Sequence, residues 1–182
     1  MLRSSLYFLF FIISLPAMTS QENEERLDLP LAQWRLVTDG VMGGVSQGQA
    51  QLADHEGSAC LHMTGEVSTR NNGGFLQVVH ELGEADKAAL SQFSGIRVRA
   101  RGNGEEYNVH LRTDRLWFPW QAYRATFTAG PEWHTVRIPF SAFAPYKTST
   151  QLDRRRISRV GVVAIGRDFS ADVCIAEIGF YK

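Results

Sequence analysis

Apolar and polar residues alternate along much of this chain, and this period of two constrains the fold more than any other sequence feature. Within 96–101, Ile96 and Val98 point to one side of an extended segment, whereas the arginines between them point to the other. The same alternation recurs at 107–113, 122–128 and 133–138. This pattern is typical of antiparallel sheets that bury one face and expose the other.

Further strands are expected on both sides of this region. They are predicted at 48–53, 59–67, 75–82, 157–166 and 173–181, with one short helix at 84–93. The segment 157–165 is almost continuously apolar, so we expect a central strand that is covered on both faces. The sequence therefore predicts an all-β chain that forms a β-sandwich or jelly roll.

The amino terminus has the features of an export signal. Arg3 supplies a positive charge, the segment 6–15 is apolar, and small residues follow Pro16. The apolar run is shorter than the roughly 20 residues that cross a bilayer, although an uncleaved anchor is the alternative. We predict a signal peptide at 1–20, a flexible lead-in at 21–33 and one β-sandwich binding domain at 34–182. The mature product would be periplasmic or secreted and would have no transmembrane segment.

Charge and cysteine content exclude several classes of protein. The 19 basic residues balance 19 acidic residues, whereas an electrostatic nucleic-acid binder needs a net basic domain. Two cysteines are too few for a disulfide scaffold or a four-cysteine zinc module. The five histidines show no zinc-ligand spacing, so we expect neither a metal nor a cofactor, although distant strands can still assemble a metal site.

The alternation argues mildly against a bond between the two cysteines. Cys60 shares its face with polar residues such as His62 and Glu66, whereas Cys174 shares its face with Ile178 and Phe180. One cysteine would then face solvent and the other would face the core. In an exported protein, a disulfide nevertheless remains the alternative.

The segment 44–48 fits the G-x-S-x-G motif of hydrolase nucleophiles, with Ser46 at its centre. That motif needs a preceding strand and a following helix. Here the residues after Ser46 look like the start of a strand. We therefore expect no catalytic residue and no enzyme.

Two glycine-rich segments, 38–46 and 68–75, are either tight corners or one rim of a binding surface. Asp39, Asn71 and Asn72 can hold such turns by hydrogen bonds to the backbone. The candidate binding residues in these segments are Asp39, Met42, Arg70, Asn71 and Asn72.

A polar sheet face provides the other candidates. If the four alternating segments between 96 and 138 are neighbours, their outward residues share one surface. That surface holds Arg97, Arg99, Arg101, Asn108, His110, Arg112, Arg124 and Arg137. The adjoining loop adds Asp114, Arg115, Trp117 and Trp120. Arginine suits bidentate contacts and exposed tryptophan suits an interface, although pairing with acidic neighbours is the alternative. We select Arg99, His110, Arg112, Asp114, Trp117, Trp120 and Arg124 as candidates.

Several motifs resemble the complex I intermediate-associated protein 30 family. They are the run from Trp34 to Ser46, the segments 63–68 and 71–75, the W-x-x-V-x-I-P-F motif that begins at Trp133, and the closing segments 157–161 and 174–180. The resemblance covers about 34–181 and implies a galactose-binding-like jelly roll. It also implies a non-catalytic role in assembling the NADH dehydrogenase complex, through binding to assembly intermediates. The export signal departs from the organelle targeting of the mitochondrial members.

Two functional hypotheses follow. An assembly or chaperone-like factor that holds a protein partner predicts an extended, fairly flat surface. A carbohydrate-binding module of the galactose-binding type predicts a concave site with an exposed tryptophan at its floor. In the second case, Trp117, Trp120, Asn71, Asn72, Arg112 and Asp114 would line the pocket.

Overall fold

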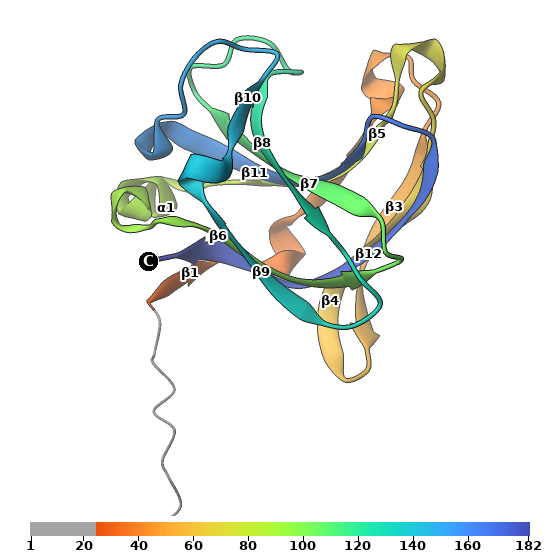
Figure 1. The fold of residues 1–182 in the computed structure, drawn as a ribbon, viewed down its shortest axis with the longest axis horizontal. Helices are drawn as coiled ribbons and strands as arrows, with labels where there is room; N and C mark the ends of the chain where they lie inside the picture. The colour runs from red at the N-terminus through yellow and green to blue at the C-terminus, as the bar shows by residue number, and fades with distance from the viewer. Residues whose placement is uncertain (1–24) are drawn as a thin grey trace, which may run out of the picture.

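The computed structural model describes residues 25–182, which form two antiparallel sheets packed face to face (Figure 1). The first sheet has the order β3 (Gln47–His55), β4 (Ser58–Val67), β12 (Phe169–Tyr181), β6 (Gly95–Gly102) and β9 (His134–Pro139), with β1 (Arg26–Asp28) also paired to β12. The second sheet has the order β10 (Ala144–Tyr146), β8 (Ala122–Thr128), β7 (Glu106–Thr113), β11 (Ile157–Ile165), β5 (Phe75–Glu81) and β2 (Arg35–Thr38). The prediction of an all-β jelly-roll sandwich is confirmed.

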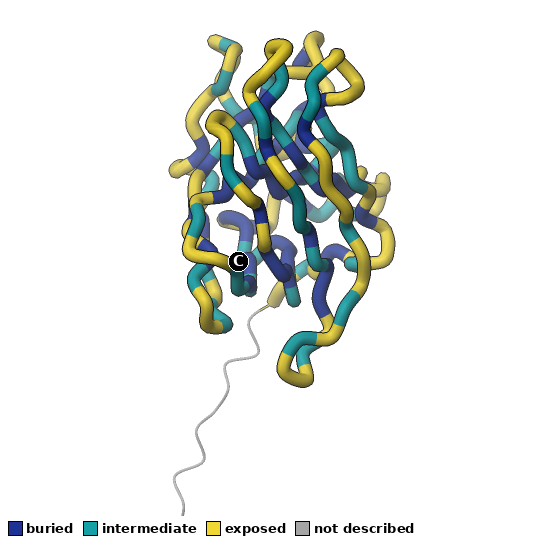
Figure 2. The backbone as a smooth tube through the Cα atoms, turned by 90° about the vertical axis from the view of Figure 1, so that its right-hand side faces the viewer, coloured by how far each residue is buried: buried dark blue, intermediate teal, exposed yellow. Residues whose placement is uncertain are grey.

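The core lies between the two sheets and is built from the inward residues of each alternating strand. Ile96 and Val98 from β6 belong to the same core as Val109 and Leu111 from β7, and all four are 0% exposed. Figure 2 shows the buried backbone inside the molecule and the exposed backbone at the strand ends and loops. Burial of one such aliphatic side chain contributes about 1.5–3 kcal/mol, so the alternation directly supplies the stability of the sandwich.

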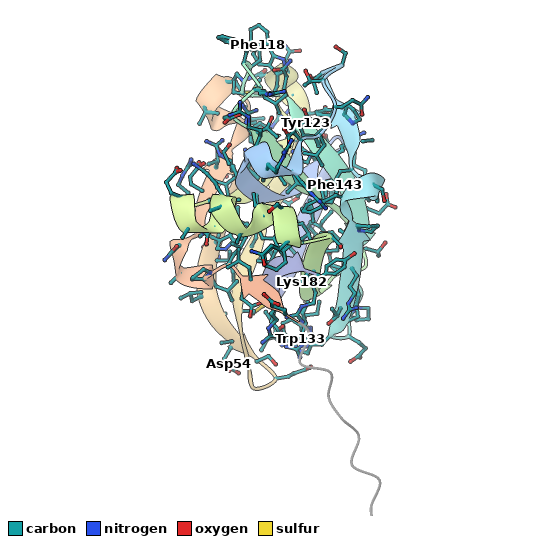
Figure 3. All side chains as sticks on the ribbon, turned by 90° about the vertical axis from the view of Figure 1, so that its left-hand side faces the viewer. Asp54, Phe118, Tyr123, Trp133, Phe143 and Lys182 are labelled. Atoms are coloured by element: carbon teal, nitrogen blue, oxygen red, sulfur yellow. A yellow bond between two sulfur atoms is a disulfide. The ribbon has the colours of Figure 1, made fainter. Side chains whose placement is uncertain are left out.

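The short helix is α1 (Glu84–Ala89), and a 3-10 turn, Leu90–Gln92, continues it. The helix crosses the middle of the side that faces the viewer in Figure 3, between the Phe118 end and the Asp54 end. Leu90, which follows the helix, is fully buried. The remaining 3-10 turns are η1 (Leu31–Gln33), η2 (Asp39–Met42), η3 (Arg70–Asn72), η5 (Phe140–Ala142) and η6 (Arg154–Arg156). In the part of the chain that the structure describes, no helix is long and apolar enough to cross a membrane.

The lead-in predicted at 21–33 is wrong for its second half. Residues Arg26–Asp28 pair with the end of β12, and Leu29 joins the core at 3% exposure. Three consecutive residues carry too short a pattern for period-two analysis, and the same reason explains why β10 was not predicted. The predicted signal peptide at 1–20 lies outside the described residues.

The predicted arginine surface is wrong, because its strands belong to different sheets. β6 pairs with β9 in the first sheet, whereas β7 pairs with β8 in the second. Arg97, Arg99, Arg101 and Arg137 therefore lie on the outer face of the first sheet, and His110, Arg112 and Arg124 lie on the opposite outer face of the molecule. Alternation identifies the outward residues within a strand, but it does not identify the sheet to which the strand belongs.

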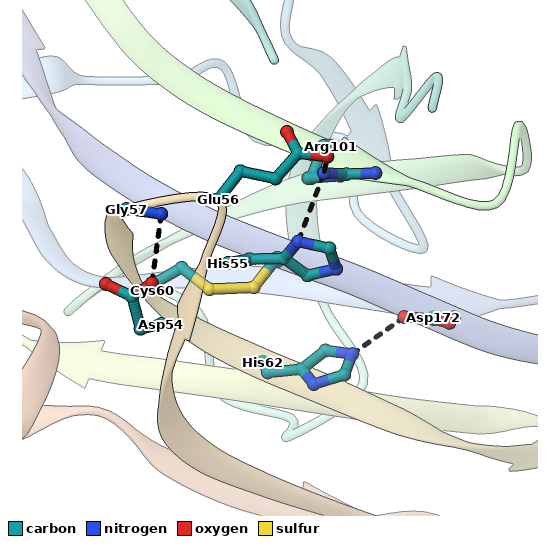
Figure 4. The surroundings of a disulfide bond; sticks show 9 residues. Asp54, His55, Glu56, Gly57, Cys60, His62, Arg101 and Asp172 are labelled. Carbon is teal, nitrogen blue, oxygen red and sulfur yellow. Dashed lines mark hydrogen bonds and ion pairs between the residues drawn. A yellow bond between two sulfur atoms is a disulfide. The ribbon is translucent and has the colours of Figure 1, made fainter. Parts of the chain in front are cut away.

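The argument against a disulfide is also wrong, because Cys60 and Cys174 are bonded with their Cα atoms 5.6 Å apart (Figure 4). A β-bulge between Ile175 and Glu177 reverses the facing of β12. Ile175 faces the core before the bulge and Ile178 faces it after the bulge, so Cys174 points outward with Cys60. Beside the bond, Arg101 contacts His55 at 3.1 Å and Glu56 at 2.7 Å.

Candidate functional site

A cleft of about 360 Å³ lies on the outer face of the second sheet. Its floor comes from β5, β7 and β11, and its sides come from the two glycine-rich loops, the β7–β8 loop and the end of β10. The β7–β8 loop lies at one end of the molecule, where Phe118 is labelled in Figure 3, and Asp54 and Trp133 lie at the other end. The cleft is lined by Val37, Val41, Met42, Asn72, Gly73, Gly74, Phe75, Gln77, His110, Arg112, Pro119, Trp120, Gln121, Ala122, Tyr146, Lys147, Arg159, Val163, Ile165 and Gly166.

Asp39 joins the two glycine-rich loops into one rim. Its carboxylate is fully buried and accepts hydrogen bonds from the Ser46 backbone N–H at 3.0 Å and the Gly74 N–H at 2.5 Å. The Ser46 hydroxyl donates to the same carboxylate at 2.5 Å. Burial alone would raise the pKa of Asp39, but the hydrogen bonds from Gly74, Ser46 and Phe75 outweigh it and hold this pKa below its ordinary value. Asp39 is therefore an ionised structural anchor that no ligand reaches.

The backbone of this rim needs the residues that the sequence places there. Asn71 and Asn72 both have φ of 57°, the left-handed region that asparagine tolerates better than most residues. Gly73 packs so tightly that a Cβ atom would lie 2.4 Å from the Asp39 carboxylate. The rim is therefore a fixed turn, and it presents Asn72 and Met42 to the cleft.

Arg112 organises the opposite rim, the β7–β8 loop. Its Nη1 group donates to the carbonyl oxygens of Phe118 and Pro119 at 2.9 Å, and the Gln121 carbonyl lies at 2.5 Å. Gln121 accepts the Phe118 N–H at 3.1 Å and donates to the Lys147 carbonyl at 3.2 Å. The loop is held before any ligand arrives, and it places Trp120 at the edge of the cleft with 47% of its surface exposed.

Two aromatic side chains, Tyr146 and His110, lie between the two rims, and basic groups lie near them. The Tyr146 ring stands 6.0 Å from the His110 ring, and the Arg124 guanidinium lies over Tyr146 at 4.3 Å. Burial and the neighbouring Arg124 and Arg112 charges lower the pKa of His110 to about 4, so this ring is neutral at pH 7. The Nε2 atom of His110 is buried and forms no hydrogen bond with any residue that the structure describes.

The structure brings together only part of the candidates selected from the sequence. Met42, Asn72, His110, Arg112 and Trp120 line the cleft, and Arg124 lies beside it. Arg70 and Asn71 are exposed on the glycine-rich rim, and Asp39 is buried beneath it. Asp114 and Trp117 line a separate shallow hollow with Arg115, Thr150 and Arg156. Arg99 lies on the opposite face, over the Trp133 ring at 4.8 Å.

Several lining residues were missed by the sequence analysis. Phe75, Gln77 and Val163 alternate with core residues along β5 and β11, so the pattern marks them as outward. It does not show that these strands adjoin β7, which requires the sheet order. Tyr146 and Lys147 lie at the end of the three-residue β10 and carry no periodic signal.

Ser46 serves the same turn as Asp39. It is 6% exposed, and its hydroxyl accepts the Ser68 N–H at 3.0 Å while donating to Asp39. A strand, β3, follows it immediately, as expected. Within 25–182, no group of three or more His, Cys, Asp or Glu side chains is placed to hold a metal ion.

Comparison with known proteins finds a sequence family that matches this chain and solved structures that share its fold. A family described as complex I intermediate-associated protein 30 matches residues 20–173. The mitochondrial protein of that name from Mus musculus is 26% identical over 127 residues, which cover 62% of this chain and 39% of that protein. The chain thus matches about two fifths of the length of this relative.

Solved carbohydrate-binding modules share the fold. A family 11 module from Clostridium thermocellum, solved with a β-1,3-1,4-mixed-linked tetrasaccharide, has a TM-score of 0.69 at 16% identity, covering 86% of this chain and 94% of that one. A family 30 module of a cellulosomal cellulase from Clostridium thermocellum has a TM-score of 0.56 at 13% identity, covering 85% and 96%. At these identities the likeness is one of fold.

Proposed function

The chain belongs to the complex I intermediate-associated protein 30 family, and from this premise we propose that it is a non-catalytic binding domain whose cleft binds an oligosaccharide. The observation that carries the proposal is the concave, prebuilt cleft with Trp120 at its edge and Tyr146 inside. A cleft of about 360 Å³ falls within the range of roughly 300–1,000 Å³ that is typical of small-molecule sites. A flat protein-binding face would lack this depth.

The lining suits the chemistry of a sugar. Pyranose rings have apolar faces that pack on aromatic rings, and their hydroxyl groups need planar polar partners around the edge. Trp120, Tyr146 and Phe75 supply the rings. Asn72 and Gln77 supply side-chain amides that form no hydrogen bond to any described residue, so they are free for ligand hydroxyls.

Rigidity supports the proposal, because a prebuilt site does not lose loop entropy when it binds. Asp39 fixes one rim by accepting the Gly74 N–H, and Arg112 fixes the other by donating to the Gln121 carbonyl. The carbohydrate-binding modules with this fold, one of them solved with a tetrasaccharide, are consistent with the proposal.

Isothermal titration against a panel of oligosaccharides tests the proposal, with two tryptophans as a matched pair. Trp120→Ala removes a ring from the cleft and should weaken binding at least tenfold. Trp117→Ala removes an equal ring that is 91% exposed and lies outside the cleft, so it should bind normally. Equal losses in both variants, or no binding of any saccharide by the wild type, would overturn the proposal.

A protein partner is the second candidate, and the exposed apolar side chains favour it. Val41 is 75% exposed and Met42 53% exposed on one rim, and Phe118 is 51% exposed and stacks on Trp120 at 4.8 Å on the other. Such a patch also suits an apolar segment of a protein. In this reading the chain is an assembly or chaperone-like factor that holds a protein partner; the mouse relative is named for association with a complex I intermediate. Capture of a specific partner that is lost in Val41→Ser plus Met42→Ser, without saccharide binding, would favour it.

We also propose that the chain acts after export, in the periplasm or outside the cell. The apolar segment 6–15 and the Cys60–Cys174 bond support this, since disulfides persist in oxidising compartments. Fractionation of cells that express the full chain, together with thiol alkylation, tests it. Recovery of a reduced protein in the cytoplasm would contradict it.

A further inference from the structure

We infer that the cleft selects acidic oligosaccharides, those that carry carboxylate or sulfate groups, over neutral ones. The inference rests on the proposed function and names the ligand class of the same site. It follows from the charges that line the cleft. Arg112, Lys147 and Arg159 are basic, and none of the lining residues among those described is Asp or Glu.

The acidic side chain that pairs with Arg159 does not cancel these charges. Glu81 contacts the Arg159 Nε atom at 2.6 Å, but it also pairs with Arg35 at 3.3 Å. One carboxylate is therefore shared by two guanidinium groups. Arg112 forms no ion pair with any residue in 25–182: its guanidinium donates to carbonyl oxygens, which carry no net charge, and the Glu81 charge acts on it only from beyond ion-pair distance.

Lys147 is placed in a way that argues for a role in binding. Its φ of 54° is uncommon for a residue other than glycine or asparagine, and such strained conformations cluster at functional sites. The Gln121 side chain holds its carbonyl at 3.2 Å, and its Nζ atom lies 5.5 Å from the centre of the Tyr146 ring. It makes no ion pair with any residue in 25–182, so its charge faces the cleft uncompensated.

Arg124 adds a further positive charge beside the cleft. Its guanidinium lies over the Tyr146 ring, and β8 places it directly opposite His110 in the register. Burial first, and then the Arg124 and Arg112 charges, lower the pKa of His110, so this ring stays neutral and adds no charge of its own to the cleft at pH 7. An anionic group on the ligand would be attracted to the basic side chains, whereas a neutral sugar would gain nothing from their charge.

Titration of the full chain with three sets of oligosaccharides of equal length tests the inference. The sets are oligogalacturonates, sulfated oligosaccharides and neutral β-1,3-1,4-glucans. We expect one of the acidic sets to bind at least tenfold more tightly than the neutral set, with affinity that falls as salt rises from 50 to 500 mM. Which acidic set binds shows whether carboxylate or sulfate is the group recognised.

Charge variants provide the second readout. Lys147→Gln plus Arg159→Gln should weaken acidic binding about tenfold and leave the melting temperature close to that of the wild type. Arg99→Gln, the same change on the opposite face, should bind normally. If the Lys147→Gln plus Arg159→Gln protein does not fold, the wild type alone provides the test. Acidic binding that weakens as salt rises supports the inference, and acidic binding that is independent of salt contradicts it.

The outcomes separate the two proposals. Neutral glucans that bind as tightly as acidic ones, without salt dependence, would overturn the charge inference and leave saccharide binding intact. Absence of binding to all three sets would overturn both.

Discussion

The Ser46 hydroxyl lies 2.5 Å from the Asp39 carboxylate, in a buried position between the two glycine-rich loops. Ser46 also accepts the Ser68 N–H at 3.0 Å, so one side chain is bonded to both loops. A motif that resembles a hydrolase nucleophile thus has a structural use here. The serine stabilises a rim of the cleft through these hydrogen bonds, and its hydroxyl faces the protein interior.

Asp39→Ala should destabilise the fold by about 3–5 kcal/mol, because it leaves the buried N–H groups of Gly74 and Ser46 without acceptors. Asp168→Ala is the control. It also removes an acceptor of a loop N–H, that of Thr69, but at an exposed site where water replaces the bond. Urea denaturation should show a loss below about 1.5 kcal/mol for this control. Similar losses for both variants would contradict the role assigned to Asp39.

Gly73→Ala should destabilise the same rim by about 2–4 kcal/mol, because the added Cβ would lie 2.4 Å from the Asp39 carboxylate and 2.9 Å from the Gly44 Cα atom. Gly130→Ala is a matched change, since a Cβ at Gly130 meets nothing within 4 Å. Thermal unfolding of the two variants measures the difference. A Gly73 variant as stable as the Gly130 variant would show that the rim rearranges to accept the added Cβ atom, which would contradict the tight packing at this position.

Periodicity predicted the strands well but not their partners. The alternation in 107–113 identified His110 and Arg112 as outward, and both line the cleft. The same reasoning put Arg99 beside them, although β6 belongs to the other sheet. Strand pairing depends on contacts between residues far apart in the chain, and a pattern within one strand carries no information on it.

The facing of Cys174 shows a second limit. A bulge inserts one extra residue and shifts every later side chain to the other face, and nothing in the apolar segment 173–180 marks where it occurs. Extrapolation backwards from Phe180 therefore assigned Cys174 to the core. Of the candidate site, the glycine-rich rim and Trp120 were recognisable from residue types, whereas Tyr146 and Gln77 enter it only through the sheet order.

Removal of the disulfide by Cys60→Ala plus Cys174→Ala should lower the free energy of unfolding by about 2–5 kcal/mol. The bond joins residues 114 positions apart, so it restricts a large part of the unfolded chain. Chemical denaturation with and without dithiothreitol measures the effect. Reductant should bring the wild type to the stability of the variant and leave the variant unchanged. A wild type that is insensitive to reductant after full reduction is confirmed would contradict this role.

His110→Gln should reduce the loss in free energy of unfolding that occurs as the pH is lowered from 6.5 to 4. Burial, Arg124 and Arg112 lower the pKa of His110 to about 4 in the folded chain, against about 6.5 when the ring is exposed. Between these pH values the unfolded chain binds a proton at this site that the native chain does not bind. The free energy of unfolding therefore falls as the pH is lowered through 6.5, and this contribution levels off near pH 4 at roughly 3 kcal/mol.

The measurement is urea denaturation of both proteins at several pH values from 8 to 4. At pH 8 the ring is neutral in both states, so the difference there reports only the loss of packing. The wild type should then lose more stability than the variant on acidification. His80, whose pKa burial also lowers, is retained in both proteins and adds the same slope to each. Parallel profiles between pH 6.5 and 4 would show that the His110 ring takes up its proton without unfolding, and would contradict its lowered pKa.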